Sequence, residues 1–194
     1  QKLRLELLRE AYGASVSTLR ELLNRLASEG LIEAEGQKGF AVMPVSATNL
    51  REIAAMRLLL AGHALAQSFA AGDMEWEGRV VAAHHKLALM ERRMLAGDRT
   101  ETELWKRYDW EFHHALISAC GSQVLHETHA AIYDKYLRYQ MVAVVFRGEI
   151  AAEEHKLLLD YAMARDTERA TAILATHVNA CVDHTAAMGG LPAD

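Results

Sequence analysis

The first thirty residues of the chain have the apolar spacing of two short amphipathic helices. Residues 2–11 form the first pattern, which ends at the turn signal Tyr12-Gly13. Ser15 or Ser17 can cap the second helix, whose leucines are spaced three and four positions apart. This second helix is expected to stop at Gly30, because glycine adopts the left-handed conformation that ends many helices.

The next fifteen residues have the alternating pattern of short strands. Apolar and polar residues alternate in 31–35 and again in 40–45, and the glycine-containing segment 36–39 separates the two runs. This arrangement predicts a β-hairpin. Helix, turn, helix and hairpin, in this order, predict a winged helix-turn-helix.

Long stretches of helical periodicity replace these short elements from Ser46 onward, with short polar or glycine-containing separators. The predicted helices cover residues 46–71, 74–96, 100–119, 122–146, 148–165 and 167–187. Long helices with short connections are typical of an antiparallel bundle. The sequence therefore predicts a mainly α protein, with a winged helix-turn-helix in residues 1–45 and an all-α bundle of about six helices in residues 46–194.

Composition agrees with a folded, mostly helical protein of the cytoplasm. Apolar residues make up 51% of the chain, and there are only two prolines. The apolar runs look shorter than the roughly 20 residues that cross a bilayer, and the first residues resemble an amphipathic helix rather than a signal peptide. Two cysteines, Cys120 and Cys181, are too few for a disulfide framework. We therefore expect no membrane partner.

The net charge of −5 argues against a protein that coats nucleic acid over its whole surface. Residues 1–50 contain as many basic as acidic side chains, so the negative charge arises from the remaining residues. A locally basic surface in the first segment is compatible with this distribution.

Four residues of the bundle have the spacing of a metal site. Asp109 and His113 are four positions apart, so they share one helix face. His155 and His177 lie at equal distances from the turn at residues 165–167, which places them at matching heights in an antiparallel helix pair. One carboxylate and three imidazoles suit zinc, nickel or an iron-group ion, with one or two positions open. For any single buried histidine, however, a core residue with satisfied hydrogen bonds is the commoner explanation.

The segment from Tyr12 to Ile32 resembles the recognition helix of GntR-family regulators, and residues 39–42 resemble the end of that family's wing. The resemblance implies contacts with the major groove of DNA. It departs from the family at Val16, where arginine is frequent, and at Thr18, where proline is frequent. It also implies that the family's first helix precedes Gln1. The implied DNA-binding residues are Ser15, Ser17, Thr18, Arg20, Arg25 and Lys38.

The rest of the chain resembles the FadR-type effector domain of the same family, through its Asp-x3-His, Glu-His and final His pattern. A finer similarity is to carbon-starvation-type repressors of glutarate catabolism. The resemblance implies that Asp109, His113, His155 and His177 hold one divalent transition metal, with zinc or nickel favoured. It further implies that Arg57 binds a carboxylate. Arg138 and Tyr139 are weaker pocket candidates, and Ala61 stands where the family has a glutamate.

The function implied is a ligand-controlled transcription regulator, most simply a repressor, that acts as a homodimer on a palindromic operator. A metal-dependent, hydrolase-like enzyme is the main alternative, because an open metal position can activate water. Against it, Glu111 and Glu154 are expected off the helical phase of the ligands, so no general base is evident. A third possibility is an effector-binding module that does not bind DNA in this form.

Six further histidines are alternative metal ligands by residue type. The neighbouring His114 points about 100° away from His113 on a helix, and His184 shares the face of His177 and is the best substitute ligand. The others are expected on solvated helix faces: His84, His85, His126 and His129.

Overall fold

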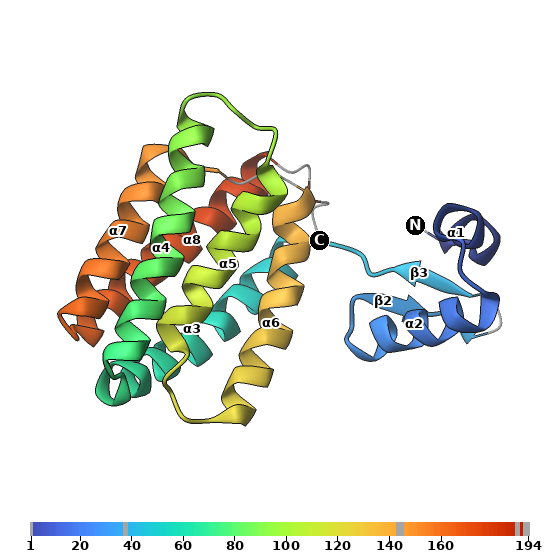
Figure 1. The fold of residues 1–194 in the computed structure, drawn as a ribbon. Helices are drawn as coiled ribbons and strands as arrows, with labels where there is room; N and C mark the ends of the chain where they lie inside the picture. The colour runs from blue at the N-terminus through green and yellow to red at the C-terminus, as the bar shows by residue number, and fades with distance from the viewer. Residues whose placement is uncertain (1, 37–38, 143–145, 189–190, 192–194) are drawn as a thin grey trace. The chain divides into compact units, whose positions relative to one another are not determined.

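Residues 2–36, 39–142, 146–188 and 191 are described by a computed structural model, in which the chain divides into two units (Figure 1). The first unit contains the residues up to Ala47, and the second begins at Thr48. The chain has the winged helix-turn-helix elements and the helix bundle that the sequence predicts.

The first unit contains two helices and a three-stranded antiparallel sheet in the order β1-β3-β2. Its elements are β1 (Lys2–Leu3), α1 (Leu5–Tyr12), α2 (Val16–Ser28), β2 (Ile32–Ala34) and β3 (Phe40–Val42). The hairpin pairs Ile32 with Val42, and β1 pairs Leu3 with Phe40 on the other edge of β3. The predicted first helix therefore begins later than expected, because pairing with β3 holds the first residues in an extended conformation.

Local signals define the ends of both helices. Gly13 ends α1 in the left-handed conformation, with φ 63°, which glycine adopts without strain. The Ser15 side chain caps α2 by accepting a hydrogen bond from the Thr18 N–H at 3.1 Å. Leu19 and Leu23 form the buried face of α2, so the opposite face of this helix is exposed.

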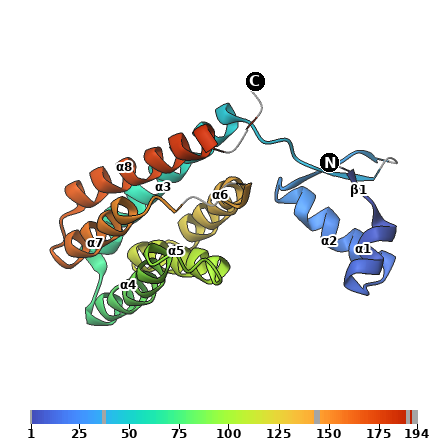
Figure 2. The ribbon, with the colours of Figure 1, turned by 90° about the horizontal axis from the view of Figure 1, so that it is seen from above.

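The second unit is a bundle of six helices. They are α3 (Ala47–Ala71), α4 (Met74–Leu95), α5 (Thr102–Ile117), α6 (Gln123–Val142), α7 (Glu149–Met163) and α8 (Thr167–Met188). Helix α4 packs against α5 and α7, and α7 packs against α8 (Figure 2). Large side chains from several helices fill the interior, including Trp76, Leu87, Phe112 and Leu158, each exposed by less than 1%.

Helix α3 is a longer apolar segment than the sequence pattern predicts. On length and composition alone it passes as a membrane-crossing helix, and 44% of its most apolar window is buried in the bundle. Nine residues of this helix are buried, from Leu50 to Phe69. Packing against neighbouring helices accounts for this composition, because a helix covered on several sides has few positions left for polar residues.

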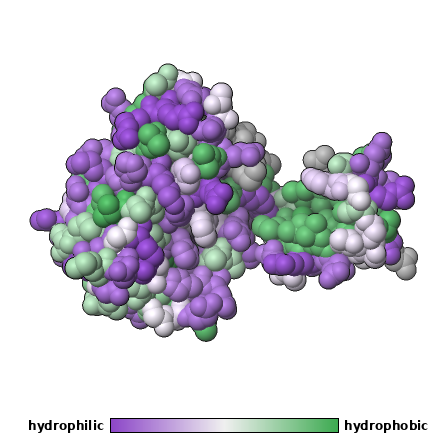
Figure 3. Space-filling view, viewed as in Figure 1, coloured by the Kyte–Doolittle hydropathy of each residue, from purple (hydrophilic) through white to green (hydrophobic). Residues whose placement is uncertain are grey.

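The visible surfaces of the two units differ in character (Figure 3). The bundle shows a mainly hydrophilic face, whereas a continuous apolar area covers much of the visible face of the first unit. Helix α1 has no buried residue, and Leu7, Tyr12 and Leu22 are among the exposed apolar side chains of this unit. The first unit thus exposes apolar side chains on both of its helices.

Candidate functional site

Three helices of the bundle bring four potential metal ligands together. Helix α5 supplies Asp109 and His113, α7 supplies His155 and α8 supplies His177. One donor atom from each lies within 4.8 Å of the others, and all four side chains are buried. The antiparallel α7–α8 pair places the last two histidines at matching heights, as their equal distances from the intervening turn predict. The arrangement can hold a single metal ion.

The donor atoms are chemically suited to a metal ion. Asp109 Oδ1 lies 3.3 Å from His155 Nε2 and 3.8 Å from His113 Nε2. Both of these Nε2 atoms are buried without a hydrogen-bond partner in the described residues. A buried polar atom without a partner costs about 1–3 kcal/mol, so it needs an explanation. A shared metal ion supplies one, because it accepts the nitrogen lone pairs and the carboxylate charge together.

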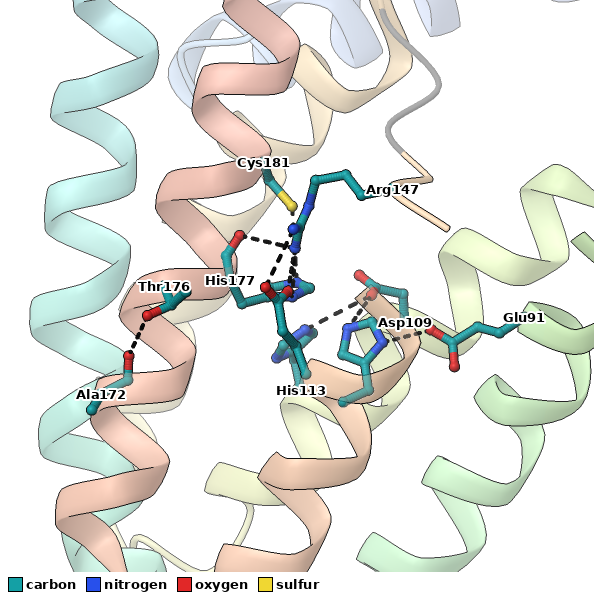
Figure 4. Close-up of polar contacts among 10 residues, drawn as sticks. Glu91, Asp109, His113, Arg147, Ala172, Thr176, His177 and Cys181 are labelled. Carbon is teal, nitrogen blue, oxygen red and sulfur yellow. Dashed lines mark hydrogen bonds and ion pairs between the residues drawn. The ribbon is translucent and has the colours of Figure 1, made fainter. Parts of the chain in front are cut away.

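Polar side chains surround the four residues and orient them (Figure 4). His155 donates from Nδ1 to Glu91 Oε1 at 2.6 Å, and His177 donates from Nδ1 to Glu154 Oε2 at 2.8 Å. The Tyr133 hydroxyl donates to Asp109 Oδ2 at 3.1 Å. Hydrogen bonding at Nδ1 leaves the Nε2 lone pair of each histidine available for a metal.

An arginine between α6 and α7 completes these contacts. Arg147 forms an ion pair with Glu154 through both terminal nitrogens, and it also donates to the His177 carbonyl at 3.4 Å. Figure 4 shows its side chain directed toward His177 and Cys181. The guanidinium thereby compensates the charge of a carboxylate that has little access to water.

The three histidines of the cluster have pKa values shifted in opposite directions from the ordinary value: His155 upward, and His113 and His177 downward. Burial lowers the pKa of His155, but the adjacent carboxylates of Asp109 and Glu91 outweigh it and raise the value to about 9. For His177, burial dominates over the Glu154 hydrogen bond and lowers the pKa to about 4. Burial also lowers the pKa of His113. In the metal-free protein, the cluster therefore holds its proton on His155, and metal binding must release that proton.

Arg57 lies beside the cluster in the bundle interior. It is 2% exposed, and its guanidinium carbon lies 4.7 Å and 4.6 Å from the ring centres of Tyr133 and Tyr136. None of the ion pairs in the described part of the chain involves Arg57. Its positive charge is close enough to contribute to the lowered pKa values of His113 and His177. Burial of a cation between two rings leaves it able to bind an anion.

The other two pocket candidates occupy the C-terminal half of α6. Tyr139 is fully buried, and its hydroxyl donates to Asn49 Oδ1 at 2.8 Å near the start of α3. Arg138 is half-buried and lies over the Tyr139 ring, with 5.1 Å between its guanidinium carbon and the ring centre. The hydrogen bond from Tyr139 to Asn49 joins α6 to the start of α3. The binding of a ligand by Arg138 or Tyr139 remains a prediction.

The predicted DNA-binding residues of α2 are exposed side chains. Ser15 and its neighbours form a small hydroxyl group, in which Ser15 Oγ lies 2.7 Å from Ser17 Oγ and 2.9 Å from Thr18 Oγ1. Arg20 is exposed, and Arg25 is exposed in an ion pair with Glu29 at 3.0 Å. The sixth predicted residue, Lys38, lies outside the described residues.

Sequence reasoning missed the carboxylates that support the cluster. The helical spacing predicts that Glu154 points away from the ligand His155 on the same helix. In the structure its side chain instead contacts His177 on the adjacent helix. The burial of Glu91 could have been predicted from the sequence, because it lies on the same face of α4 as the apolar residues Leu87, Met90 and Met94. Arg147 lies in the connection between α6 and α7, where no helical periodicity predicts which way its side chain points.

The expectation that His129 lies on a solvated face is also wrong. It is 4% exposed, on the side of α6 that faces the bundle interior. Nearby Arg57 and burial lower its pKa, with burial the larger cause. The helical spacing from His129 to Tyr133 and Tyr136 is the signal that identifies this buried face.

Comparison with known families agrees with this arrangement. Residues 1–42 match the bacterial regulatory proteins of the gntR family, and residues 52–180 match the FCD domain. The chain belongs to the GntR family of transcription regulators. Members of this family are transcription regulators and not enzymes, so the hydrolase alternative is wrong.

Similar proteins share both parts of this GntR-family regulator. The HTH-type transcriptional regulator BphR of Paraburkholderia xenovorans is 36% identical over 93% of this chain and 75% of that protein. The HTH-type transcriptional repressor GlaR of Escherichia coli is 31% identical over 92% of this chain and 83% of that protein. The solved structure of E. coli McbR/YncC has the same fold, with a TM-score of 0.79, 22% identity, and coverage of 95% of this chain and 86% of that one.

Proposed function

We propose that this GntR-family regulator senses a small carboxylate in its helix bundle and changes its binding to DNA in response. The observation that carries the proposal is the buried Arg57, which has no carboxylate partner in the described ion pairs and lies beside the four-residue cluster. Contact with two aromatic rings offsets only part of the cost of burying a cation, so an anionic ligand at this place is stabilised. Planar guanidinium groups bind carboxylates through paired hydrogen bonds.

A divalent metal held by Asp109, His113, His155 and His177 is the second part of the ligand site. Three imidazoles and one carboxylate favour zinc or nickel over calcium or magnesium. When bound, the ion supplies positive charge and open coordination positions for an oxygen of the ligand. The chain's own residues do the rest: Glu91 and Glu154 orient two of the histidines, and Arg57 holds the carboxylate.

The DNA-binding part of the proposal assigns α2 to the major groove. Its exposed face carries Ser15, Ser17, Thr18, Arg20 and Arg25, whereas Leu19 and Leu23 hold the helix against its own unit. A homodimer would present two such helices to the half-sites of a palindrome, about one helical turn apart. Repression is the favoured direction, since the relative GlaR is named a repressor.

The carboxylate part can be tested by titrating citrate, succinate and acetate into the zinc-loaded full chain by calorimetry. Arg57→Gln should weaken the binding of the best of these ligands at least tenfold. Arg51→Gln is the matched control, because Arg51 is an exposed arginine on the same helix, and its affinity should equal that of the wild type. Equal affinities for the wild type and Arg57→Gln, or no binding of any of the three, would contradict the proposal.

The DNA part can be tested by selecting bound sequences from a random duplex library with the full chain. Palindromic sequences should be enriched, with affinity that falls steeply as salt rises. Addition of the carboxylate identified above should change that affinity. Enrichment of no sequence would instead favour an effector-binding module that does not bind DNA in this form.

A further inference from the structure

A cleft of about 540 Å³ opens on one flank of α2, within the first unit. Its lining comes from three places in the chain. Arg20 belongs to α2, and Gly39 belongs to the turn of the β2–β3 hairpin. Lys2, Arg4 and Glu6 come from β1 and the start of α1. The cleft therefore lies between the helix proposed to enter the major groove and the hairpin that follows it.

The pairing of β1 with β3 brings two basic side chains to this cleft. Strand β1 runs antiparallel to β3, with Lys2 opposite Ala41. Arg4 continues the extended conformation, with φ −90° and ψ 116°. Side chains two positions apart in an extended chain point to the same face, so Lys2 and Arg4 lie side by side. A helix over residues 2–11, as the sequence predicts, would separate them by about 200° around its axis.

The charges at the cleft leave two arginines available to an anion. Arg4 and Arg20 are exposed, and neither forms an ion pair within the described residues. The Arg4 side chain also makes no capping hydrogen bond at the start of α1. Lys2 Nζ lies 3.4 Å from a carboxylate oxygen of Glu35, in an exposed ion pair of a kind that contributes about 0–1 kcal/mol. With Glu6, the lining carries three basic side chains and one acidic one.

The flank of α2 is where a helix in the major groove meets the DNA backbone. A helix with its side chains is about 10–12 Å across, and the major groove is about 12 Å wide. A helix in the groove therefore has a phosphate strand along each flank. Basic side chains on such a flank contact phosphates, and these contacts fix the position of the protein on the duplex without reading the bases.

We propose that Lys2 and Arg4, together with Arg20, bind a phosphate strand of DNA in this cleft. Neither Lys2 nor Arg4 is among the residues to which the family resemblance gives a DNA contact. The inference rests on the proposed placement of α2 in the major groove. Glu6 limits the attraction, because its carboxylate lines the same cleft and repels phosphate.

The test is the affinity of the full chain for a mixed-sequence duplex, measured by fluorescence anisotropy from about 50 to 200 mM salt. Arg4→Gln should lower the slope of log affinity against log salt by about 0.9, because one fewer counterion is released. The same loss weakens binding about eightfold at about 0.1 M salt. Lys2→Gln should also lower the slope, whereas Glu6→Gln should strengthen binding. Circular dichroism checks that each variant keeps its helix content.

Arg9→Gln and Glu10→Gln are the matched controls for Arg4→Gln and Glu6→Gln. Both residues are exposed in the C-terminal half of α1, outside the lining of the cleft. Each control changes the net charge as its partner variant does, so a difference between the two reports on position. Equal salt slopes for Arg4→Gln and Arg9→Gln would overturn this proposal while leaving DNA binding by α2 intact. A wild type that does not bind the duplex at the lowest salt would overturn both.

Discussion

At the scale of single residues, the proposed metal site depends on side chains that are not themselves proposed ligands. His155 and His177 each have a carboxylate on Nδ1, and Asp109 accepts from a buried tyrosine hydroxyl. Such contacts fix ring orientation and raise the basicity of the donor nitrogen. The buried carboxylates of α4 and α7 therefore belong to the functional description of the regulator, although neither is a proposed ligand.

Replacement of Glu91 by glutamine should lower metal affinity about 10–100-fold, because the neutral amide orients and polarises His155 less strongly than the carboxylate does. Zinc affinity can be measured by competition with a chromophoric chelator. Glu111→Gln is the control, since Glu111 is a half-buried carboxylate that pairs with Lys86 on the outside of the cluster. Equal losses in the two variants would contradict a specific role for Glu91.

His129 should contribute a measurable pH dependence to stability. Burial, with a smaller effect of Arg57, lowers its pKa from an ordinary 6.5 to about 4 in the folded state. The unfolded chain therefore binds a proton more readily, so the free energy of unfolding falls as pH decreases from 6.5 toward 4. Between pH 6.5 and 5 this loss is about 2 kcal/mol.

The measurement is urea unfolding of the metal-free protein at several pH values, for the wild type and His129→Gln. The variant should lose about 2 kcal/mol less than the wild type over this pH interval. Other buried histidines contribute equally to both proteins, so they cancel in the difference. Parallel pH profiles for the two proteins would show that His129 does not titrate as the structure implies.

At the scale of elements, the junction between α3 and α4 has no room for a side chain at Gly72. A Cβ atom on Gly72 would approach Arg165 Nη1 to 2.6 Å and the Trp76 ring to 2.6 Å. Trp76 is fully buried, and Arg165 donates to the Gly72 carbonyl at 2.9 Å, so neither side chain can move without losing contacts. This junction therefore ties α3, α4 and the α7–α8 turn together.

Gly72→Ala should accordingly destabilise the bundle by about 1–3 kcal/mol through overpacking. The matched control is Gly78→Ala, because nothing lies within 4 Å of an added Cβ at this exposed position inside α4. That change should stabilise the protein by about 1 kcal/mol, since alanine favours a helix over glycine. Chemical denaturation of both variants tests the expected opposite signs.

Helix α2 offers a test that separates capping from DNA contact. Ser15→Ala should destabilise the first unit by about 1 kcal/mol, because it removes the acceptor for the Thr18 N–H. Ser15→Asp should keep the cap but weaken DNA binding, since a carboxylate there would repel phosphate. Amide hydrogen exchange reports on the cap, and duplex binding reports on the contact. Unimpaired DNA binding by Ser15→Asp would argue against this face of α2 as the interface.

At the scale of the whole molecule, metal binding should stabilise one unit and leave the other unchanged. All four proposed ligands lie in the unit that begins at Thr48. A free metal concentration 1,000 times the dissociation constant adds about 4 kcal/mol to the stability of the state that binds it. Hydrogen exchange should therefore slow in α5, α7 and α8 when zinc is added, with α2 unaffected.

A chelator should reverse this protection, and Asp109→Ala should abolish it. Asp98→Ala is a suitable control, because Asp98 is a carboxylate of the same unit outside the cluster, paired with Arg93. Protection in α5, α7 and α8 that persists in Asp109→Ala would mean that zinc binds elsewhere in the bundle. Equal protection of both units would show that the metal acts through assembly rather than through this site.

The sequence by itself determined the order of the helices and the hairpin, but not the strand β1 at Lys2–Leu3. The four proposed ligands were predicted from their spacing together with the family resemblance. Helical and alternating periodicities are local properties, so they identified the hairpin and the six long helices from spacing alone. Asp109 and His113 could be paired because a helix fixes the directions of residues four apart, and His155 and His177 because a short turn fixes antiparallel register.

Only the tertiary structure decided which polar groups surround those ligands. Glu91 meets His155 across 64 positions of sequence, and the pairing of Arg147 with Glu154 depends on how the α6–α7 connection folds back. The burial of Arg57 between two tyrosines of α6 likewise follows from packing between helices. Contacts between elements depend on relative rotation and height, which no local pattern encodes, and these contacts fix the charge and protonation of the site.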